Sequence, residues 1–205
     1  YTKRNDIKLR TTIADQQGNI VYDKTADMHF NRKMRTNELK WETIDIAEPK
    51  LWSCETPHLY TATVTILDDN GNETDRTSTR FGIRTIEIGP DFGLKVNGKK
   101  VLLKGIANHH TLGALGAAAY PRAMEKRIQM LRDFGFNHIR TSHNPYSTSF
   151  LDLCDQYGIL VLDELYDKWL KQYAGGRISW EALWQHDVPE WVKRDRNHPS
   201  VILWS

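Results

Sequence analysis

Apolar and polar residues alternate along the first part of the chain. The pattern is clear in "IKLRTTI" at 7–13 and again in "LYTATVTIL" at 59–67. A period of two is typical of half-buried antiparallel strands. The turn-forming runs "DQQGN" at 15–19 and "DDNGN" at 68–72 come directly after such strands. No amphipathic helix fits this part, so we predict a small β-sandwich of about five or six strands over residues 1–88.

The pattern changes in residues 89–205. A hairpin is predicted around Asn97-Gly98, a pair that suits a tight turn. Beyond it, apolar residues at helical spacing alternate with short apolar runs. Helices are expected from Pro121 to about Gly135, from Ser147 to Tyr157, and from about Trp180 to Arg196 with an internal Pro189. Strands are expected to end at Asn108 and to include "FNHIRT" at 136–141, "ILVLDE" at 159–164 and "VILW" at 201–204.

This order of strands and helices predicts a parallel sheet with right-handed crossovers. Two folds compete, a doubly wound open sheet and a (β/α)₈ barrel. The connection after the first strand, "GIANHHTLGALGAAAYP" at 105–121, is long and has no GxGxxG motif opening a helix. We therefore predict that residues 89–205 form the first four strands of a TIM barrel.

Polar side chains follow the apolar strands at the ends where barrel enzymes carry their chemistry. These ends are Asn108-His109-His110, then Arg140 to Pro145, then Asp163-Glu164, then Trp204-Ser205. The structural alternative is that these groups cap loops and satisfy one another. Neighbouring strand residues point to opposite faces, so Asp163 and Glu164 cannot flank one bond as an acid/base pair. One of the two is expected to pair with Arg140.

The remaining composition excludes several classes of function. The net charge is +2 with basic residues scattered along the chain, which argues against a nucleic-acid partner. No apolar run is long enough to predict a membrane span. His109 and His110 are adjacent and have no third ligand at a recognisable spacing, so no metal is predicted. The two cysteines are expected to be free thiols, with Cys154 inert on a helix core face and Cys54 reactive in a loop.

Six stretches, taken together, resemble glycoside hydrolase family 2, the β-galactosidases, β-glucuronidases and β-mannosidases. They occur in the family's order and spacing, and the segment at 109–118 is most similar to bacterial β-galactosidases. The stretches are "PKLWSCETPHLYT" at 49–61, "FGIRTIEI" at 81–88, "VNGKKVLLKGIANHH" at 96–110, "FNHIRTSHNP" at 136–145, "LDLCDQYGILVLDE" at 151–164 and "RDRNHPSVILWS" at 194–205.

The resemblance implies an immunoglobulin-like sandwich followed by half of a TIM barrel, within a retaining exo-β-glycosidase. No cofactor is predicted from the sequence. It also implies that the acid/base glutamate and the nucleophilic glutamate both lie beyond Ser205. On this interpretation the chain is an internal fragment, inactive by itself, whose open barrel edges favour self-association. The expected parent activity is that of a β-galactosidase. The alternatives are a β-glucuronidase or β-mannosidase of the same family, or a non-catalytic carbohydrate-binding or scaffolding module.

The same resemblance assigns a substrate-binding set to this chain. Arg140 would orient carboxylates, and His143 and Asn144 would hydrogen-bond the sugar. Asp163 or Glu164 would brace Arg140 or accept a bond from a sugar hydroxyl, and Trp169 would offer a stacking face. The full expected set is His109, His110, Arg140, His143, Asn144, Asp163, Glu164, Asp167 and Trp169.

Overall fold

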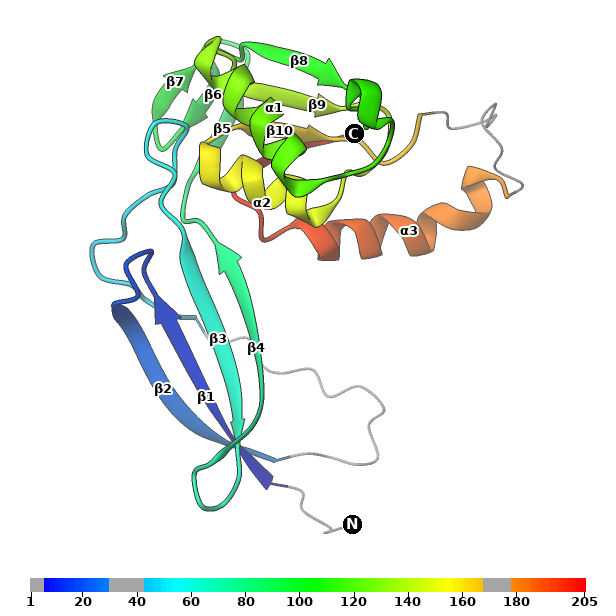
Figure 1. The fold of residues 1–205 in the computed structure, drawn as a ribbon. Helices are drawn as coiled ribbons and strands as arrows, with labels where there is room; N and C mark the ends of the chain where they lie inside the picture. The colour runs from blue at the N-terminus through cyan, green and yellow to red at the C-terminus, as the bar shows by residue number, and fades with distance from the viewer. Residues whose placement is uncertain (1–5, 30–42, 168–177) are drawn as a thin grey trace. The chain divides into compact units, whose positions relative to one another are not determined.

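The computed structural model describes residues 6–29, 43–167 and 178–205 (Figure 1). The chain forms two compact units. The first unit comprises Tyr1–Lys50 and Leu59–Phe81, and the second comprises Leu51–His58 and Gly82–Ser205. The short segment Leu51–His58 therefore belongs to the second unit, although residues of the first unit precede and follow it in the sequence.

The first unit contains a four-stranded antiparallel sheet in the order β2-β1-β3-β4. The strands are β1 (Asp6–Ala14), β2 (Ile20–His29), β3 (Tyr60–Leu67) and β4 (Glu73–Phe81). Both predicted turns form, and they have the same hydrogen-bond pattern. The Asp15 and Asp68 carboxylates each accept backbone N–H bonds from the turn that follows. The strands predicted at 7–13 and 59–67 are confirmed as β1 and β3, and four strands of the expected five or six lie among the described residues of this unit.

The second unit begins with a three-stranded antiparallel sheet of β5 (Ile86–Gly89), β6 (Gly93–Val96) and β7 (Lys99–Val101). The β6–β7 turn has positive φ at Asn97 (52°) and Gly98 (74°), as a type I′ turn requires. The boundary at residue 88, which the sequence predicts between the sandwich and the barrel, falls inside β5. Since β5 pairs with β6, residues 86–89 are held by backbone bonds to the second unit.

A four-stranded parallel sheet follows in the order β11-β10-β9-β8 (Figure 1). Its strands are β8 (Gly105–Asn108), β9 (His138–Thr141), β10 (Leu160–Asp163) and β11 (Val201–Trp204). They alternate with α1 (Pro121–Asp133), α2 (Thr148–Tyr157) and α3 (Trp180–Asp195), and a 3₁₀ turn, η1 (Gly113–Leu115), precedes α1. The predicted order of strands and helices is confirmed.

The helices cover one face of this sheet. Ile139 and Val161, which are fully buried, pack with Ile128 of α1 and Leu151 of α2 in one hydrophobic core. Asp163 lies two residues after Val161 on β10 and therefore on the same face, where it accepts a hydrogen bond from Trp191 of α3. Helices on one face only are the arrangement of a barrel wall and exclude the doubly wound alternative.

The segment Leu51–His58 is anchored to the second unit by Trp52. The indole of Trp52 is fully buried, and its Nε1 donates to the Asp155 carbonyl oxygen at 2.8 Å. The Trp52 backbone N–H donates to the Ile83 oxygen, and its carbonyl accepts from Asn97 Nδ2 at 2.9 Å. Trp52 thus fixes the segment, because its indole N–H and both of its backbone polar groups are hydrogen-bonded.

Both cysteines are free thiols, as predicted. Cys154 of α2 is fully buried in the hydrophobic core, and burial raises its pKa. Cys54 is partly buried, and burial followed by the charge of Glu55 raises its pKa to about 11. A thiol with this pKa holds little thiolate at neutral pH. We therefore replace the expectation of a reactive Cys54 with that of a slow one.

Candidate functional site

The polar cluster at the carboxyl end of the sheet is organised by Arg140 and Glu164. Arg140 Nε and Nη2 each donate to one Glu164 oxygen at 2.9 Å, which is a bidentate ion pair. The Glu164 side chain is 6% exposed and that of Arg140 is 43% exposed, so the guanidinium covers the carboxylate. The predicted pairing of Arg140 with one of the two adjacent carboxylates is confirmed, and the partner is Glu164.

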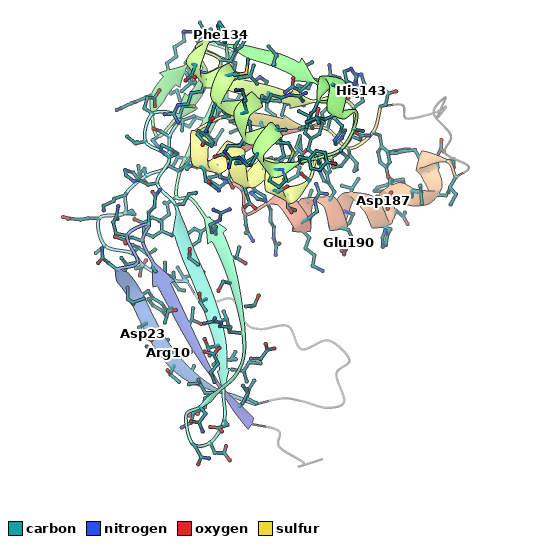
Figure 2. All side chains as sticks on the ribbon, viewed as in Figure 1. Arg10, Asp23, Phe134, His143, Asp187 and Glu190 are labelled. Carbon is teal, nitrogen blue, oxygen red and sulfur yellow. The ribbon has the colours of Figure 1, made fainter. Side chains whose placement is uncertain are left out.

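His143 lies beside this ion pair. Its Nδ1 is 3.5 Å from Glu164 Oε1 and 3.5 Å from Asp167 Oδ1. The ring of His109 meets that of His143 edge to face, with ring centroids 5.3 Å apart. Figure 2 shows His143 at the end of the sheet toward which β8 and β9 point. Five predicted residues, from three strand ends, therefore come together: His109, Arg140, His143, Glu164 and Asp167.

His110 and Asn144 form a separate pair. His110 Nε2 and Asn144 Oδ1 are 2.7 Å apart. The His110 ring also packs on Tyr146, with centroids 3.9 Å apart, and Tyr146 in turn contacts Phe150 of the hydrophobic core. The contacts recorded for these two predicted residues thus tie them to each other and to the loop that follows β9.

Asp163 lies on the other face of β10. Its carboxylate is fully buried and is hydrogen-bonded to Thr141 Oγ1 at 3.2 Å and Trp191 Nε1 at 2.7 Å. Strand alternation separates it from Glu164, as the sequence argument required. Its predicted contact with Arg140 or a sugar is replaced by contacts on the helix side. The last member of the predicted set, Trp169, lies outside the described residues.

Sequence reasoning missed the groups that surround Asp163. Burial and the nearby charge of Asp195 raise the pKa of Asp163 to about 6. Arg194 donates to both Asp195 oxygens, at 2.8 and 2.6 Å. Thr141 is fully buried. The only sequence signal for this layer was the hydroxyl at the end of an apolar strand, which is too common to single out.

The described carboxylates of the cluster are poorly suited to attack an anomeric carbon. Both Glu164 oxygens already accept bonds from Arg140, and the side chain is nearly buried. Asp167 is 44% exposed and lies within ion-pair distance of His143. The arrangement can orient a polar ligand through Arg140 and His143, whose side chains are partly exposed. It has the chemistry of hydroxyl recognition rather than of bond cleavage.

Three residues elsewhere in the second unit could offer metal ligands. Ligand atoms of Asp152, Asp155 and His198 lie within 4.8 Å of one another. The two Asp155 oxygens, however, already face His198 Nδ1 at 2.6 Å and the Ser200 N–H at 3.1 Å. These contacts satisfy the carboxylate without an ion.

An apolar groove of about 400 Å³ runs between η1 and α1. Its lining includes Leu115, Met130 and Phe134, and it carries little polar surface to recognise a sugar. We therefore place the candidate site at the polar strand ends and not in this groove. Among the described residues, no helix is long and apolar enough to cross a membrane.

The chain matches two family models. "Glycosyl hydrolases family 2" covers residues 2–84, and "Glycosyl hydrolases family 2, TIM barrel domain" covers residues 90–205. A β-galactosidase of Bacteroides ovatus is 41% identical over 169 residues, which are 80% of this chain and 19% of that protein. The chain thus spans about a fifth of that relative's length.

Solved structures give the same result. A family 2 member from Bacteroides cellulosilyticus matches 97% of this chain and 26% of its own, at 38% identity and a TM-score of 0.88. The β-glucuronidase of Parabacteroides merdae matches 98% and 24%, at 27% identity and a TM-score of 0.80. With the sheet, the one-sided helices and the polar strand ends described, the chain belongs to glycoside hydrolase family 2, and it comprises an immunoglobulin-like domain followed by the start of the TIM-barrel domain.

Proposed function

We propose that this chain supplies part of the sugar-binding wall of a retaining exo-β-glycosidase that acts on terminal β-galactosides. The observation that carries the proposal is the Arg140–Glu164 ion pair with His143 beside it, at the barrel end where family 2 enzymes bind substrate. Arg140 and His143 are partly exposed and offer N–H donors to ring hydroxyls. His109 and Asp167 border the same wall.

Charge on this wall favours a neutral sugar over a uronic acid. The guanidinium of Arg140 is already matched by the Glu164 carboxylate, and Asp167 adds a further negative charge. A uronate carboxylate placed here would meet two fixed carboxylates and a cation that is already paired. Sequence identity does not separate the two classes, since a putative β-glucuronidase of Formosa agariphila is 42% identical to this chain and the Bacteroides ovatus β-galactosidase is 41% identical.

We infer that the two catalytic carboxylates come from outside this chain. Retaining glycosidases hold an acid/base and a nucleophile about 5–5.5 Å apart across the bond. The one carboxylate of the wall that is close to Arg140 is held there by two hydrogen bonds. The 205-residue chain alone should therefore bind sugar weakly, with a Kd of about 1 mM or more, and cleave none.

The test uses the full-length protein that contains this chain and the 205-residue chain side by side. Nitrophenyl β-galactoside, β-glucuronide and β-mannoside are supplied to both. We expect the full-length protein to turn over the β-galactoside fastest and the shorter chain to turn over none. Faster turnover of the β-glucuronide would refute the substrate class. Sugar binding by the full-length protein with no turnover of any glycoside would favour a carbohydrate-binding module instead.

We also propose that the 205-residue chain self-associates. Among the described residues, β8 and β11 each have one strand neighbour, so each presents an unpaired edge. Sedimentation velocity over a wide range of concentrations should show dimers or larger species. A monomer throughout that range would refute this part of the proposal.

A further inference from the structure

Two buried polar residues lie directly behind the sugar-binding wall. Thr141, at the end of β9, and Asp163, at the end of β10, are each fully buried. Both belong to the helix-facing side of the sheet, whereas Arg140 and Glu164 belong to the opposite side. Buried polar groups are costly unless they are hydrogen-bonded. Their partners therefore show what the two residues do.

Those partners form one connected path from α3 to Glu164. Trp191 Nε1 donates to Asp163 Oδ2 at 2.7 Å. Thr141 Oγ1 donates to Asp163 Oδ1 at 3.2 Å, which is nearer than the Leu162 carbonyl oxygen at 3.4 Å, and the same hydroxyl oxygen accepts the backbone N–H of Glu164 at 2.9 Å. A hydroxyl has one proton, and an ionised carboxylate is only an acceptor. Asp163 therefore orients the Thr141 hydroxyl so that a lone pair faces the Glu164 amide.

The Glu164 amide bonds to this hydroxyl at the point where strand pairing ends. The pairing of β10 with β9 stops at Leu162, and its pairing with β11 stops at Asp163. Two further backbone bonds hold the neighbours of Glu164, from the Ser205 N–H to the Asp163 oxygen and from the Leu165 N–H to the Ser205 oxygen, each at 2.8 Å. The recorded partner of the Glu164 N–H itself is Thr141 Oγ1.

Asp163 is an acceptor at neutral pH, although its surroundings act in opposite directions. Burial and the charge of Asp195 raise its pKa to about 6, while the hydrogen bonds from Trp191 and Thr141 act to lower it. Arg194 neutralises Asp195 through two hydrogen bonds, which limits the repulsion between the two carboxylates. The layer behind the wall is thus a satisfied network with a definite direction of hydrogen bonding.

We propose that Thr141 and Asp163 are positioning residues of the glycosidase site, because they fix the main chain of Glu164 and so aim its carboxylate at Arg140 and His143. Neither residue touches the sugar. Both act through Glu164, whose side chain starts from the Cα next to the held amide. A displacement there would shift the Arg140–Glu164 ion pair, and misplacement of about 1 Å can cost about 10²-fold in rate.

The test compares Thr141→Val with Thr141→Ser in the full-length protein that contains this chain. Valine keeps the shape of threonine but removes the hydroxyl, and serine restores the hydroxyl. We expect Thr141→Val to lower kcat/KM for the preferred nitrophenyl glycoside about tenfold or more, and Thr141→Ser to return it to within about threefold of wild type. Thr79→Val, on the exposed strand β4, is the matched control and should leave kcat/KM unchanged.

A second readout does not depend on activity. Hydrogen exchange of the peptide spanning residues 162–166 should speed up in Thr141→Val, because the Glu164 amide has lost its acceptor, and should stay slow in Thr141→Ser. Trp191→Phe removes the donor at the other end of the path and should lower kcat/KM in the same direction. It replaces Thr141→Val as the decisive variant if the valine protein does not fold.

The outcomes separate this inference from the proposed function on which it rests. If the wild-type full-length protein cleaves no glycoside, the proposed function fails, and the exchange measurement still decides whether Thr141 holds Glu164. If the wild type is active but Thr141→Val matches it in kcat/KM and in exchange, the positioning role is refuted. Equal losses in Thr141→Val and Thr141→Ser would also refute it, since the hydroxyl would then not be the group that matters.

Discussion

The pairing of His198 with Asp155 should make the stability of the second unit depend on pH. His198 Nδ1 and Asp155 Oδ2 are 2.6 Å apart, and their side chains are 13% and 4% exposed. Asp155 Oδ1 also accepts the Ser200 N–H at 3.1 Å, so this carboxylate ties the turn before β11 to α2. The perturbation is His198→Gln, which keeps a side-chain donor but removes the positive charge.

The sign follows from the pKa of His198. Burial acts to lower this pKa, but the hydrogen bond and the charge of Asp155 raise it above the ordinary value of 6.5. A histidine whose folded-state pKa is raised contributes stability that is fully present below its unfolded pKa. That contribution is lost as the pH rises through the folded pKa. The contribution of His198 should therefore be complete near pH 6 and gone once the ring is neutral in the folded protein.

The magnitude follows from the loss of charge. The Asp155 carboxylate stays charged in His198→Gln, so the variant loses the attraction between the two charges, and one unit of raised pKa corresponds to about 1.4 kcal/mol. His198→Gln should therefore lower the free energy of unfolding by about 1–1.5 kcal/mol at pH 6. At pH 9 the wild-type ring is itself neutral, so the difference in unfolding free energy between the two proteins should shrink to roughly a few tenths of a kcal/mol.

Urea unfolding followed by tryptophan fluorescence at pH 6 and pH 9 measures both differences, since the chain has seven Trp. Subtracting the wild-type curve removes the titration of other groups. His186→Gln is the matched control, because the His186 side chain is 80% exposed beside Asp187 and its loss should change little at either pH. A His198→Gln penalty that is equal at the two pH values, or larger at pH 9, would refute the ion-pair reasoning.

Three further outcomes are expected. At pH 7 both thiols should react slowly with a disulfide reagent, Cys54 because its pKa is raised to about 11 and Cys154 because it is fully buried; rapid labelling of either in the folded protein would contradict this. Gly158→Ala should destabilise the protein by more than about 1 kcal/mol in urea unfolding, since φ is +69° and a Cβ would lie 2.2 Å from the Cys54 carbonyl oxygen; an unchanged midpoint would show that α2 ends differently. Arg10→Ala should leave the melting temperature unchanged, because its ion pair with Asp23 (Figure 2) is solvent-exposed; a clear fall would show that the pair is stabilising.

The candidate site shows where sequence reasoning stopped. The sequence predicted that Arg140 would pair with either Asp163 or Glu164, because neighbouring side chains of a strand point to opposite faces of the sheet. Which of them faces Arg140 depends on the register of β9 against β10, where Leu162 pairs with Arg140. That register places Glu164 on the side of Arg140 and Asp163 on the side of the helices. No pattern within either strand records it.

The adjacent histidines show the same limit. His109 and His110 follow one strand and look equivalent in the sequence, yet His109 meets His143 while His110 pairs with Asn144 and packs on Tyr146. Their partners come from another strand end. Only the packing of the two loops decides which ring meets which partner.

Local patterns by themselves determined the elements of this protein. The period of two, the helical spacing, and the Asp, Asn-Gly and Pro signals identified strands, turns and helices because these depend on interactions between near neighbours in the sequence. Tertiary structure decided the one-sided covering of the parallel sheet, the anchoring of Trp52 and the buried path from Trp191 to Glu164. These features join residues far apart in the chain, and they depend on strand register and on complementary packing, which a single sequence does not encode locally.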